Sequence, residues 1–317
     1  MAAIDYPVDL EAPDISAYRN GNTGVDYVHT FEGEVSGPHF MVSAVVHGNE
    51  LCGAIALDFL LRNDFRPVRG KLTLGFMNVD AYESFDPSNP TASRYVDEDF
   101  NRLWNEETLD GERDSVELRR ARQVRPIFVQ VDYLLDVHSM QHATVPLMMC
   151  GALEKGRRLA RQIGAPEHVV ADAGHAAGRR MRDYAAFNDP ASDKNALLVE
   201  CGQHWEPASA DVAKDVVLRF LGNFDLASQE FIDAHMEHSP PPIQYVIEVT
   251  GPVTIETDAF RFAEEFRGME IISDAGTVIG WDGDKEILTP YDDCVLIMPS
   301  RRLKKGESAV RFGRFTT

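Results

Sequence analysis

Apolar residues in the first two thirds of the chain follow two alternating patterns. Short runs rich in β-branched and other apolar residues predict buried strands, and longer stretches with apolar residues three or four positions apart predict helices. Strands are predicted at residues 39–46, 71–79, 133–139, 146–150, 168–172 and 196–202. Helices are predicted at residues 50–63, 115–128, 152–163 and 210–224. Because near-continuous apolar strands alternate with helices, we expect an α/β fold with a mostly parallel or mixed sheet flanked by helices.

The pattern changes after residue 238. Residues 239–242 read Ser-Pro-Pro-Pro, and consecutive prolines cannot continue a helix. Beyond them, short apolar runs are broken by Gly, Asp and Pro, which is typical of an all-β unit. The sequence therefore predicts an α/β domain at residues 1–238 and a small all-β C-terminal domain at residues 239–317.

Composition and charge narrow the class of protein. With 44% hydrophobic and 26% charged residues the chain has the composition of an ordinary globular protein. A net charge of −20 argues against binding nucleic acid or an anionic membrane, since both need clustered Lys and Arg. The sequence also lacks a secretory signal and any run of about 18 apolar residues. We expect a cytoplasmic protein without nucleic-acid or membrane partners, and the composition leaves a homo-oligomer open.

The four cysteines do not form a recognisable pattern. They are Cys52, Cys150, Cys201 and Cys294, and no two of them make a CxxC pair. This spacing favours buried, reduced thiols over a disulfide framework or a thiolate zinc site.

Two of the predicted strands are followed by residues that bind metals. His47 and Glu50 lie where the strand at 39–46 meets the next helix, and this spacing lets both side chains reach one ion. His138, at the end of another strand, would complete the His₂Glu set of many catalytic zinc sites. Asp136 lies on the same strand face and could orient His138. The alternatives are a capped helix beside a surface histidine, and a satisfied core histidine.

Glu200 ends an otherwise apolar strand. Glutamate is rarely buried unless it is paired or functional, so its position needs an explanation. One explanation is a general base beside a zinc-activated water. The other is an ion pair at the strand end with Arg179, Arg180 or Arg182.

The segment at residues 78–104 is long for a connection and rich in Asp, Ser, Pro and Asn, as functional loops often are. Arg94 and Arg102 offer planar guanidinium groups that suit a carboxylate, and Asn101 adds a neutral donor. The alternative is that both arginines balance the local acids Asp97, Glu98 and Asp99.

Taken in order, these elements resemble a known family. His-Gly-Asn-Glu, a loop arginine followed by Asp-Phe-Asn-Arg, then Asp-Val-His, then a Glu closing an apolar strand resemble the succinylglutamate desuccinylase/aspartoacylase family of the zinc carboxypeptidase-like group. The motifs cover roughly residues 38–225. By this resemblance the zinc ligands are His47, Glu50 and His138, the general base is Glu200, and the substrate-binding loop contributes Arg94, Asn101 and Arg102.

The resemblance implies a fold and an activity. The fold is a zinc carboxypeptidase-like α/β domain followed by a β domain that shapes the mouth of the site. The activity is zinc-dependent hydrolysis of the amide of a small anionic N-acyl amino acid, with one zinc per chain. Two departures from the family pattern, Asp-Phe-Asn-Arg for the commoner Asp-Leu-Asn-Arg and the Cys-Gly-Gln-His after Glu200, leave the acyl group open.

Two other functions remain as alternatives, a zinc carboxypeptidase acting on peptides and a non-catalytic metal- or ligand-binding protein. A deep pocket roofed by the C-terminal domain would favour small acyl amino acids, and an open groove would favour peptides. An anionic substrate of so acidic a chain would need a local positive field from a metal ion and buried arginines. Arg180 and Arg182 could bind a second carboxylate or form a solvated basic patch, and Tyr291 could reach the site from the C-terminal domain.

Overall fold

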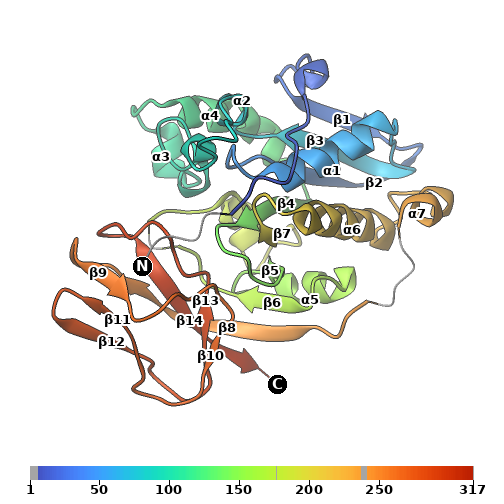
Figure 1. Cartoon of the computed structure of the whole chain (residues 1–317). Helices are drawn as coiled ribbons and strands as arrows, with labels where there is room; N and C mark the ends of the chain where they lie inside the picture. The colour runs from blue at the N-terminus through green and yellow to red at the C-terminus, as the bar shows by residue number, and fades with distance from the viewer. Residues whose placement is uncertain (1–5, 176, 237–240, 317) are drawn as a thin grey trace.

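The centre of the molecule is one mixed sheet of eleven strands (Figure 1). The computed structural model describes residues 6–175, 177–236 and 241–316. The strands lie in the order β1-β3-β2-β4-β7-β5-β6-β8-β14-β13-β10. The first seven along the chain are β1 (Val28–Glu32), β2 (Val35–Ala44), β3 (Arg69–Phe76), β4 (Tyr133–Met140), β5 (Leu147–Met149), β6 (His168–Ala171) and β7 (Asn195–Gln203). The expected fold class, a mixed sheet flanked by helices, is confirmed.

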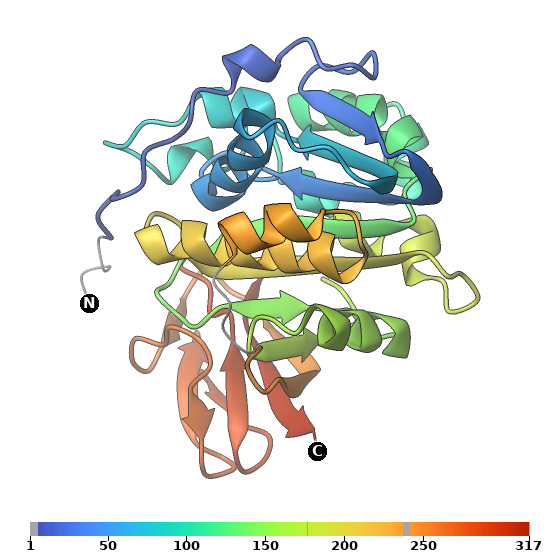
Figure 2. The same ribbon diagram turned by 90° about the vertical axis from the view of Figure 1, so that its right-hand side faces the viewer.

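Helices cover both faces of this sheet (Figures 1 and 2). On one face lie α1 (Leu51–Arg62), α5 (Glu154–Ile163), α6 (Pro207–Asn223) and α7 (Gln229–His235). On the other lie α3 (Glu106–Asp110) and α4 (Val116–Phe128), while α2 (Val79–Glu83) contributes Val79 and Tyr82 to the apolar cluster of the first face. Short 3₁₀ helices occur at Ser16–Tyr18, Ala92–Arg94, Phe100–Arg102, Met181–Asp183 and Ala185–Asn188. A separate cluster of buried apolar side chains fills each interface, because each helix turns one apolar stripe toward the sheet.

Three neighbouring strands position the candidate site residues. β2, β4 and β7 are adjacent and parallel, so their carboxyl ends meet at one edge of the sheet. His138 and Glu200 lie near the carboxyl ends of β4 and β7, and His47 and Glu50 follow the end of β2. In an open α/β sheet this edge is where ligands bind.

The strand pattern differs from the sequence prediction in three places. β1 was not predicted, and it pairs antiparallel with β3 at the edge of the sheet. β5 pairs antiparallel with β7, which an apolar run cannot reveal because strand direction depends on the connections. The strand expected to reach residue 79 ends at Phe76, and Val79 begins α2.

The C-terminal part is all-β in the residues described, as expected. Its strands are β8 (Tyr245–Thr254), β9 (Phe260–Phe262), β10 (Ile271–Ile272), β11 (Val278–Asp282), β12 (Lys285–Leu288), β13 (Cys294–Ile297) and β14 (Ser308–Thr316). β9, β11 and β12 form a small second sheet, whereas β8 pairs parallel with β6 and so continues the main sheet. The predicted boundary between residues 238 and 239 lies outside the described residues, and the division into two domains stays a prediction.

Two smaller expectations concern the cysteines and the membrane. All four cysteines are free and buried, as predicted. Among the described residues, no helix has the length and apolar character needed to cross a bilayer.

Candidate active site

His47, Glu50 and His138 come together at the carboxyl edge of the sheet. Nδ1 of His47 lies 2.6 Å from Oε1 of Glu50, and Nδ1 of His138 lies 2.8 Å from Oε2 of the same carboxylate. One ligand atom from each residue lies within 4.8 Å of the others, so the three could hold one metal ion. Their relative exposures are only 4%, 2% and 1%, which excludes the alternative of a surface histidine beside a helix cap.

The local backbone explains why these residues converge. Glu50 is the N-cap residue of α1 but makes no side-chain capping bond, so its carboxylate is left to face the two imidazoles. Gly48 allows the close packing of this turn, because a Cβ there would lie 2.3 Å from the carbonyl carbon of Ala81. The turn is therefore fixed against the start of α2.

The surroundings of His138 fit a bound cation. Its Nε2 donates to Oδ2 of Asp136 at 2.8 Å, and Oδ1 of Asp136 accepts from the Ser43 hydroxyl at 2.6 Å. With that proton on Nε2, Nδ1 is an acceptor that faces another acceptor, the carboxylate of Glu50, at 2.8 Å. Two acceptors this close need a proton or a metal ion between them. The predicted orienting role of Asp136 agrees with this geometry.

The pKa values of His138 and Glu50 also indicate that their surroundings favour positive charge. Burial lowers the pKa of His138, but Asp136 and Glu50 outweigh it and raise that pKa well above its ordinary value. Burial raises the pKa of Glu50, but the two histidines hold it well below its ordinary value. The pocket thus favours a cation among these atoms.

Glu200 lies directly across from His138 in the register of β4 and β7. Its side chain is buried, and its Oε2 has no hydrogen-bond partner among the described residues. Burial raises the pKa of Glu200 to about 8; Glu50 adds to the rise, while His138 and Arg94 oppose it. The alternative of an ion pair at the strand end is not seen in the described part of the chain, because Arg180 and Arg182 pair with Asp183 instead.

The loop between β3 and α4 brings Arg94 to the triad. Nη1 of Arg94 lies 3.4 Å from Oε1 of Glu50, and Nη2 lies 3.1 Å from Oδ2 of Asp99. Nε2 of His47 lies 2.9 Å from both Asp99 Oδ1 and Arg94 Nη2. The expected balancing of local acids therefore holds for Arg94 and Asp99, but in contact with the predicted metal ligands.

Asn101 and Arg102 have different surroundings. The amide oxygen of Asn101 accepts from the backbone N–H of Met181 at 2.7 Å, so Asn101 ties the loop to the segment before β7. Arg102 donates only to the carbonyl of Asn101, at 2.7 Å, and has no ion pair with a described residue. Its pKa falls to about 10, first through burial and then through neighbouring arginines. Asp99 opposes this fall, but no described carboxylate forms an ion pair with the half-buried Arg102.

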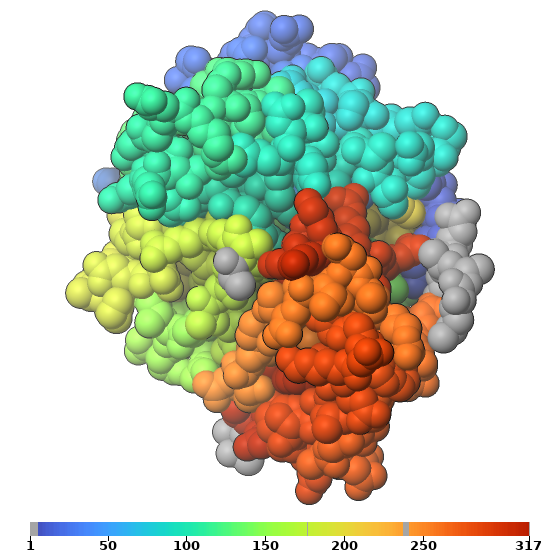
Figure 3. Space-filling model, turned by 90° about the vertical axis from the view of Figure 1, so that its left-hand side faces the viewer, coloured from blue at the N-terminus to red at the C-terminus, as the bar shows by residue number. Residues whose placement is uncertain are grey.

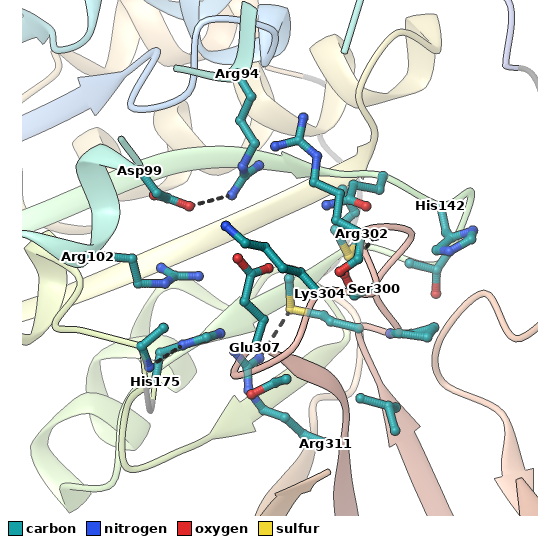
Figure 4. A pocket seen from close by; sticks show the side chains of 18 of the residues that line it. Arg94, Asp99, Arg102, His142, His175, Ser300, Arg302, Lys304, Glu307 and Arg311 are labelled. Carbon is teal, nitrogen blue, oxygen red and sulfur yellow. Dashed lines mark hydrogen bonds and ion pairs between the residues drawn. The ribbon is translucent and has the colours of Figure 1, made fainter. Parts of the chain in front are cut away.

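A cavity of about 240 Å³ adjoins this loop (Figure 4). Its basic lining residues are Arg94, Arg102, Arg267, Arg302, Lys304 and Arg311. The only carboxylates among its lining residues are Asp99 and Glu307. Residues 298–311, between β13 and the end of β14, form one wall, and Figure 3 shows the C-terminal part in orange and red lying against the N-terminal half in cyan. The cavity provides the positive field that an anionic substrate of this acidic chain would need.

Sequence reasoning missed much of this wall. Arg302, Lys304 and Arg311 belong to the C-terminal segment, and His175 comes from the loop after β6. The basic run at residues 301–305 was a signal that could have pointed to the first two. Nothing in the local sequence marks Arg311 or His175.

Three of the site residues expected from the sequence are not brought to the cavity. Arg180 is buried and pairs with Asp172 at 2.6 Å and Asp183 at 2.6 Å. Arg182 donates to Asp183 at 2.5 Å and to backbone carbonyls. The hydroxyl of Tyr291 bonds to Thr250 at 2.6 Å, and Arg314 covers its ring at 4.1 Å from the centroid. Internal pairing holds the two arginines, and the tyrosine lies among the C-terminal strands.

Known proteins resemble this chain in sequence. The family model described as the succinylglutamate desuccinylase/aspartoacylase catalytic domain matches residues 36–221. A succinylglutamate desuccinylase of Vibrio cholerae serotype O1 is 23% identical over 290 residues, which cover 86% of this chain and 79% of that protein. A homologue from Vibrio vulnificus with the same name is 22% identical over 284 residues, again 86% and 79% of the two chains.

Solved structures share the fold. The crystal structure of succinylglutamate desuccinylase from Vibrio cholerae superposes with a TM-score of 0.66 at 17% identity, covering 92% of this chain and 86% of that one. Murine aminoacylase 3 superposes with a TM-score of 0.59 at 17% identity, covering 88% and 95%. Since the family model matches more than half of its length, the chain belongs to the succinylglutamate desuccinylase/aspartoacylase family of amide-hydrolysing deacylases.

Proposed function

We propose that this chain is a zinc-dependent hydrolase that cleaves the amide of a small anionic N-acyl amino acid. His47, Glu50 and His138 would hold one zinc ion per chain, because two imidazole nitrogens and a carboxylate are a common donor set for catalytic zinc. The observation that carries the proposal is the convergence of this buried triad, an unpartnered Glu200 and a cation-lined cavity at one edge of the sheet. The cytoplasmic location expected from the sequence stays a prediction.

Separate residues of the chain transfer the proton, orient a metal ligand and bind the substrate. When bound, zinc supplies positive charge that polarises the amide carbonyl and makes the attacking water more acidic. Glu200 accepts the proton of that water and delivers it to the leaving amine, a role that suits a carboxylate whose Oε2 has no other partner. Asp136 holds the ring of His138, and Arg102 pairs with a carboxylate of the substrate to orient the amide.

The raised pKa of Glu200 is consistent with proton transfer. Burial, opposed by His138 and Arg94 and reinforced by Glu50, raises the pKa of Glu200 to about 8, which favours the protonated acid. A cation held by the triad would oppose that rise and favour the carboxylate before reaction. Glu200 is thereby poised to gain and lose a proton near neutral pH.

The shape of the site supports a small substrate over a peptide. The wall formed by residues 298–311 closes one side of the cavity, whereas a carboxypeptidase needs an open path for the rest of the peptide. The excess of basic side chains also supports an anionic acyl amino acid. A non-catalytic role would leave the buried, unpartnered oxygen of Glu200 without an explanation, since such a group costs stability.

Substrate screening with metal analysis tests the proposal. The zinc-loaded chain is incubated with acetyl, succinyl and formyl amino acids and with short peptides, and release of free amine is followed. We expect hydrolysis of at least one acyl amino acid and loss of that activity in Glu200→Gln with its zinc retained. Faster hydrolysis of the peptides would favour the carboxypeptidase, and no hydrolysis of any compound would favour the binding protein.

A further inference from the structure

Glu117 is a buried carboxylate at the start of α4. Its relative exposure is 0%, and no ion pair joins it to a lysine or arginine within the described parts of the chain. Its Oε1 accepts from the backbone N–H of Val96 at 2.7 Å and from the side-chain amide of Asn78 at 3.1 Å. Its Oε2 accepts from the backbone N–H groups of Asp97 and Glu98, at 3.1 Å and 3.2 Å. Four donors thus fill the acceptor sites of one carboxylate.

Stabilisation of α4 does not explain these bonds. An acidic residue in the first turn of a helix usually interacts with the N-terminal N–H groups of its own helix. In α4 the capping role belongs to Ser115, whose hydroxyl accepts from the N–H of Leu118 at 3.0 Å. The carboxylate of Glu117 is bonded to another part of the chain, residues 96–98, called here the loop segment.

The loop segment also bonds back to the start of α4. Oδ2 of Asp97 accepts from the N–H of Val116 at 2.8 Å, and Oε1 of Glu98 accepts from the hydroxyl of Ser115 at 2.6 Å. The loop segment adopts neither helix nor strand. In the structure as described, its three N–H groups have no hydrogen-bond acceptor other than Glu117. The position of this segment therefore depends on that carboxylate.

The loop segment lies between two residues of the candidate site. Arg94 precedes it by two positions and Asp99 follows it directly, and their side chains pair at 3.1 Å (Figure 4). Both contact Nε2 of His47 at 2.9 Å, and Arg94 also lies 3.4 Å from Oε1 of Glu50. A carboxylate on the outer nitrogen of a metal-binding histidine orients its ring. Asp99 can do this for His47 only while the loop segment holds it there.

Asn78 links the same carboxylate to the turn that carries His47. Its side-chain amide donates to Glu117, and its backbone N–H donates to the carbonyl of Val45 at 2.9 Å. Val45 lies two residues before His47 and has a φ of 51°, which is unfavourable for a β-branched residue. The bond from Asn78 helps to hold this turn. Glu117 therefore reaches the surroundings of His47 by two routes.

We propose that Glu117 is a positioning residue for the site. Its carboxylate fixes the loop segment, and the loop segment keeps Arg94 and Asp99 against His47. Both side chains are then in place before a ligand binds, which avoids the entropy loss of ordering them during binding. For catalysis this inference rests on the proposed deacylase function. The hold on the loop segment and on His47 can be measured without it.

Hydrogen exchange of the metal-free chain, followed by NMR, tests the hold on the loop segment. In wild type its three amide hydrogens should exchange about tenfold or more slowly than in an unstructured peptide. Glu117→Gln turns an amide group toward N–H donors, so their exchange should accelerate about tenfold or more. Val124→Ala is the matched control, because Val124 is buried on the same helix about two turns beyond Glu117. Unprotected hydrogens in wild type, or equal acceleration in the control, would overturn the inference.

Zinc affinity, measured by competition with a chelator, tests the link to His47. Asp99→Asn should weaken zinc binding about 10- to 100-fold, the usual loss for a residue that orients a metal ligand. Glu117→Gln should weaken it about fivefold or more alone, but less than about twofold further in the Asp99→Asn background, because its effect passes through Asp99. Val124→Ala should leave the affinity unchanged. Losses that multiply fully in the double variant, or no loss in Glu117→Gln, would make Glu117 merely structural and overturn the inference.

Asp97→Ala provides a milder variant should Glu117→Gln not fold. Asp97 is exposed, and the substitution removes only its bond to the N–H of Val116. Exchange in the loop segment should accelerate and zinc affinity should fall, each by a smaller factor of about two to five. Unchanged exchange and affinity in Asp97→Ala would contradict the hold of α4 on the loop segment.

Kinetics separates this inference from the proposed function. On an acyl amino acid that wild type hydrolyses, zinc-saturated Glu117→Gln should lose about tenfold or more in kcat, with KM changed less than about threefold, because the residues it positions contact the metal ligands. If the zinc affinities behave as expected but no amide is hydrolysed, the deacylase function fails and the positioning role stands. If wild type hydrolyses the substrate and Glu117→Gln matches it in zinc affinity and kcat, the positioning role fails alone. A wild type that binds no zinc would overturn both.

Discussion

Asp136 contacts His138 and Asp99 contacts His47, but only the first of these contacts could be predicted from the sequence. Asp136 lies two residues before His138 on the same strand, so strand geometry alone predicts the bond of 2.8 Å between them. Asp99 is 52 residues from His47 in sequence, and a loop of irregular structure brings it within 2.9 Å. Its proximity to basic residues suggested charge balance instead. Irregular loops follow no hydrophobic periodicity, so the contacts that their side chains make cannot be predicted from the sequence pattern.

The metal ligands give the first prediction. His47→Ala or His138→Ala should abolish stoichiometric zinc binding, because two remaining protein ligands rarely hold a catalytic zinc ion. Metal analysis of the purified variants measures this, with His168→Ala at the start of β6 as the matched control. Full zinc occupancy in both triad variants would contradict the assignment.

Glu200→Gln gives the second prediction. The variant should keep its zinc and its fold but lose about 10² to 10⁴ in kcat, because an amide cannot take the proton from water. The matched control is Glu248→Gln, an exposed carboxylate on β8. A fall in kcat of less than about threefold would remove Glu200 from the role of base.

The pH dependence of stability gives the third prediction. In the metal-free chain the pKa of Glu200 rises from 4.5 to about 8, so the folded state holds a proton that the unfolded state releases between these values. The stabilisation is complete below the lower value and is lost as the pH rises through the higher one. Glu200→Gln has no such proton, so its melting temperature relative to wild type should increase by several degrees between about pH 5 and about pH 9.

Thermal melts of the chelator-treated proteins across this pH range test the sign. Groups far from the site titrate alike in both proteins, so the difference between wild type and variant reports on Glu200 together with the groups coupled to it, Glu50 and His138. A difference that stays constant with pH, or that falls, would show that Glu200 is not a carboxyl group with a raised pKa.

At the scale of elements, the parallel strands β2, β4 and β7 explain why the sequence was informative. Apolar runs located their ends, and polar residues at those ends met in space because parallel neighbours share an edge. The loop at residues 78–104 was recognised as functional by its length, but its contacts were not predictable. Its two 3₁₀ turns, Ala92–Arg94 and Phe100–Arg102, give the two arginines different partners, since Arg94 contacts Glu50 and Asp99 and Arg102 contacts the carbonyl of Asn101.

Asn101 gives the fourth prediction, which concerns this loop. Asn101→Ala removes the acceptor of the Met181 N–H and leaves that buried donor unpaired, at a cost of about 1–3 kcal/mol of stability. Since Arg102 is the next residue, kcat/KM for an acidic substrate should also fall, with zinc content unchanged. Chemical unfolding and kinetics measure both effects, and Asn89→Ala, an exposed position in the same loop, is the control. Wild-type stability and kinetics in Asn101→Ala would contradict an anchoring role.

At the scale of the whole molecule, the acidic chain gathers six Arg and Lys side chains around the cavity where the C-terminal strands meet the α/β part. The sequence predicted this β-rich part and its boundary region from the prolines, but it could not show that β8 would pair with β6. Pairing between strands more than 70 residues apart depends on long-range packing, which local sequence patterns cannot predict. The cavity wall at residues 298–311 was missed for the same reason.

Shared packing suggests that the two predicted domains fold as one unit. A buried cluster combines Met149, Val170 and Leu198 from the first part with Ile247 and Ile297 from the second. Together with the continuous sheet, this cluster makes the folding of each part depend on the other. By this argument, the boundary predicted near residue 238 does not separate two cooperative folding units.

Ile297→Ala gives the fifth prediction. Ile297 is fully buried on β13, and truncating such a side chain costs about 2–5 kcal/mol. The metal-free chain should unfold in a single calorimetric transition that this substitution shifts as a whole, in both near-ultraviolet circular dichroism and tryptophan fluorescence. The neighbouring strand supplies a matched control, because Ile271 on β10 is half exposed and Ile271→Ala should change the transition little. Two separate transitions, of which Ile297→Ala moved only one, would instead indicate that the β-rich part folds independently and that the continuous sheet is a docking contact between two domains.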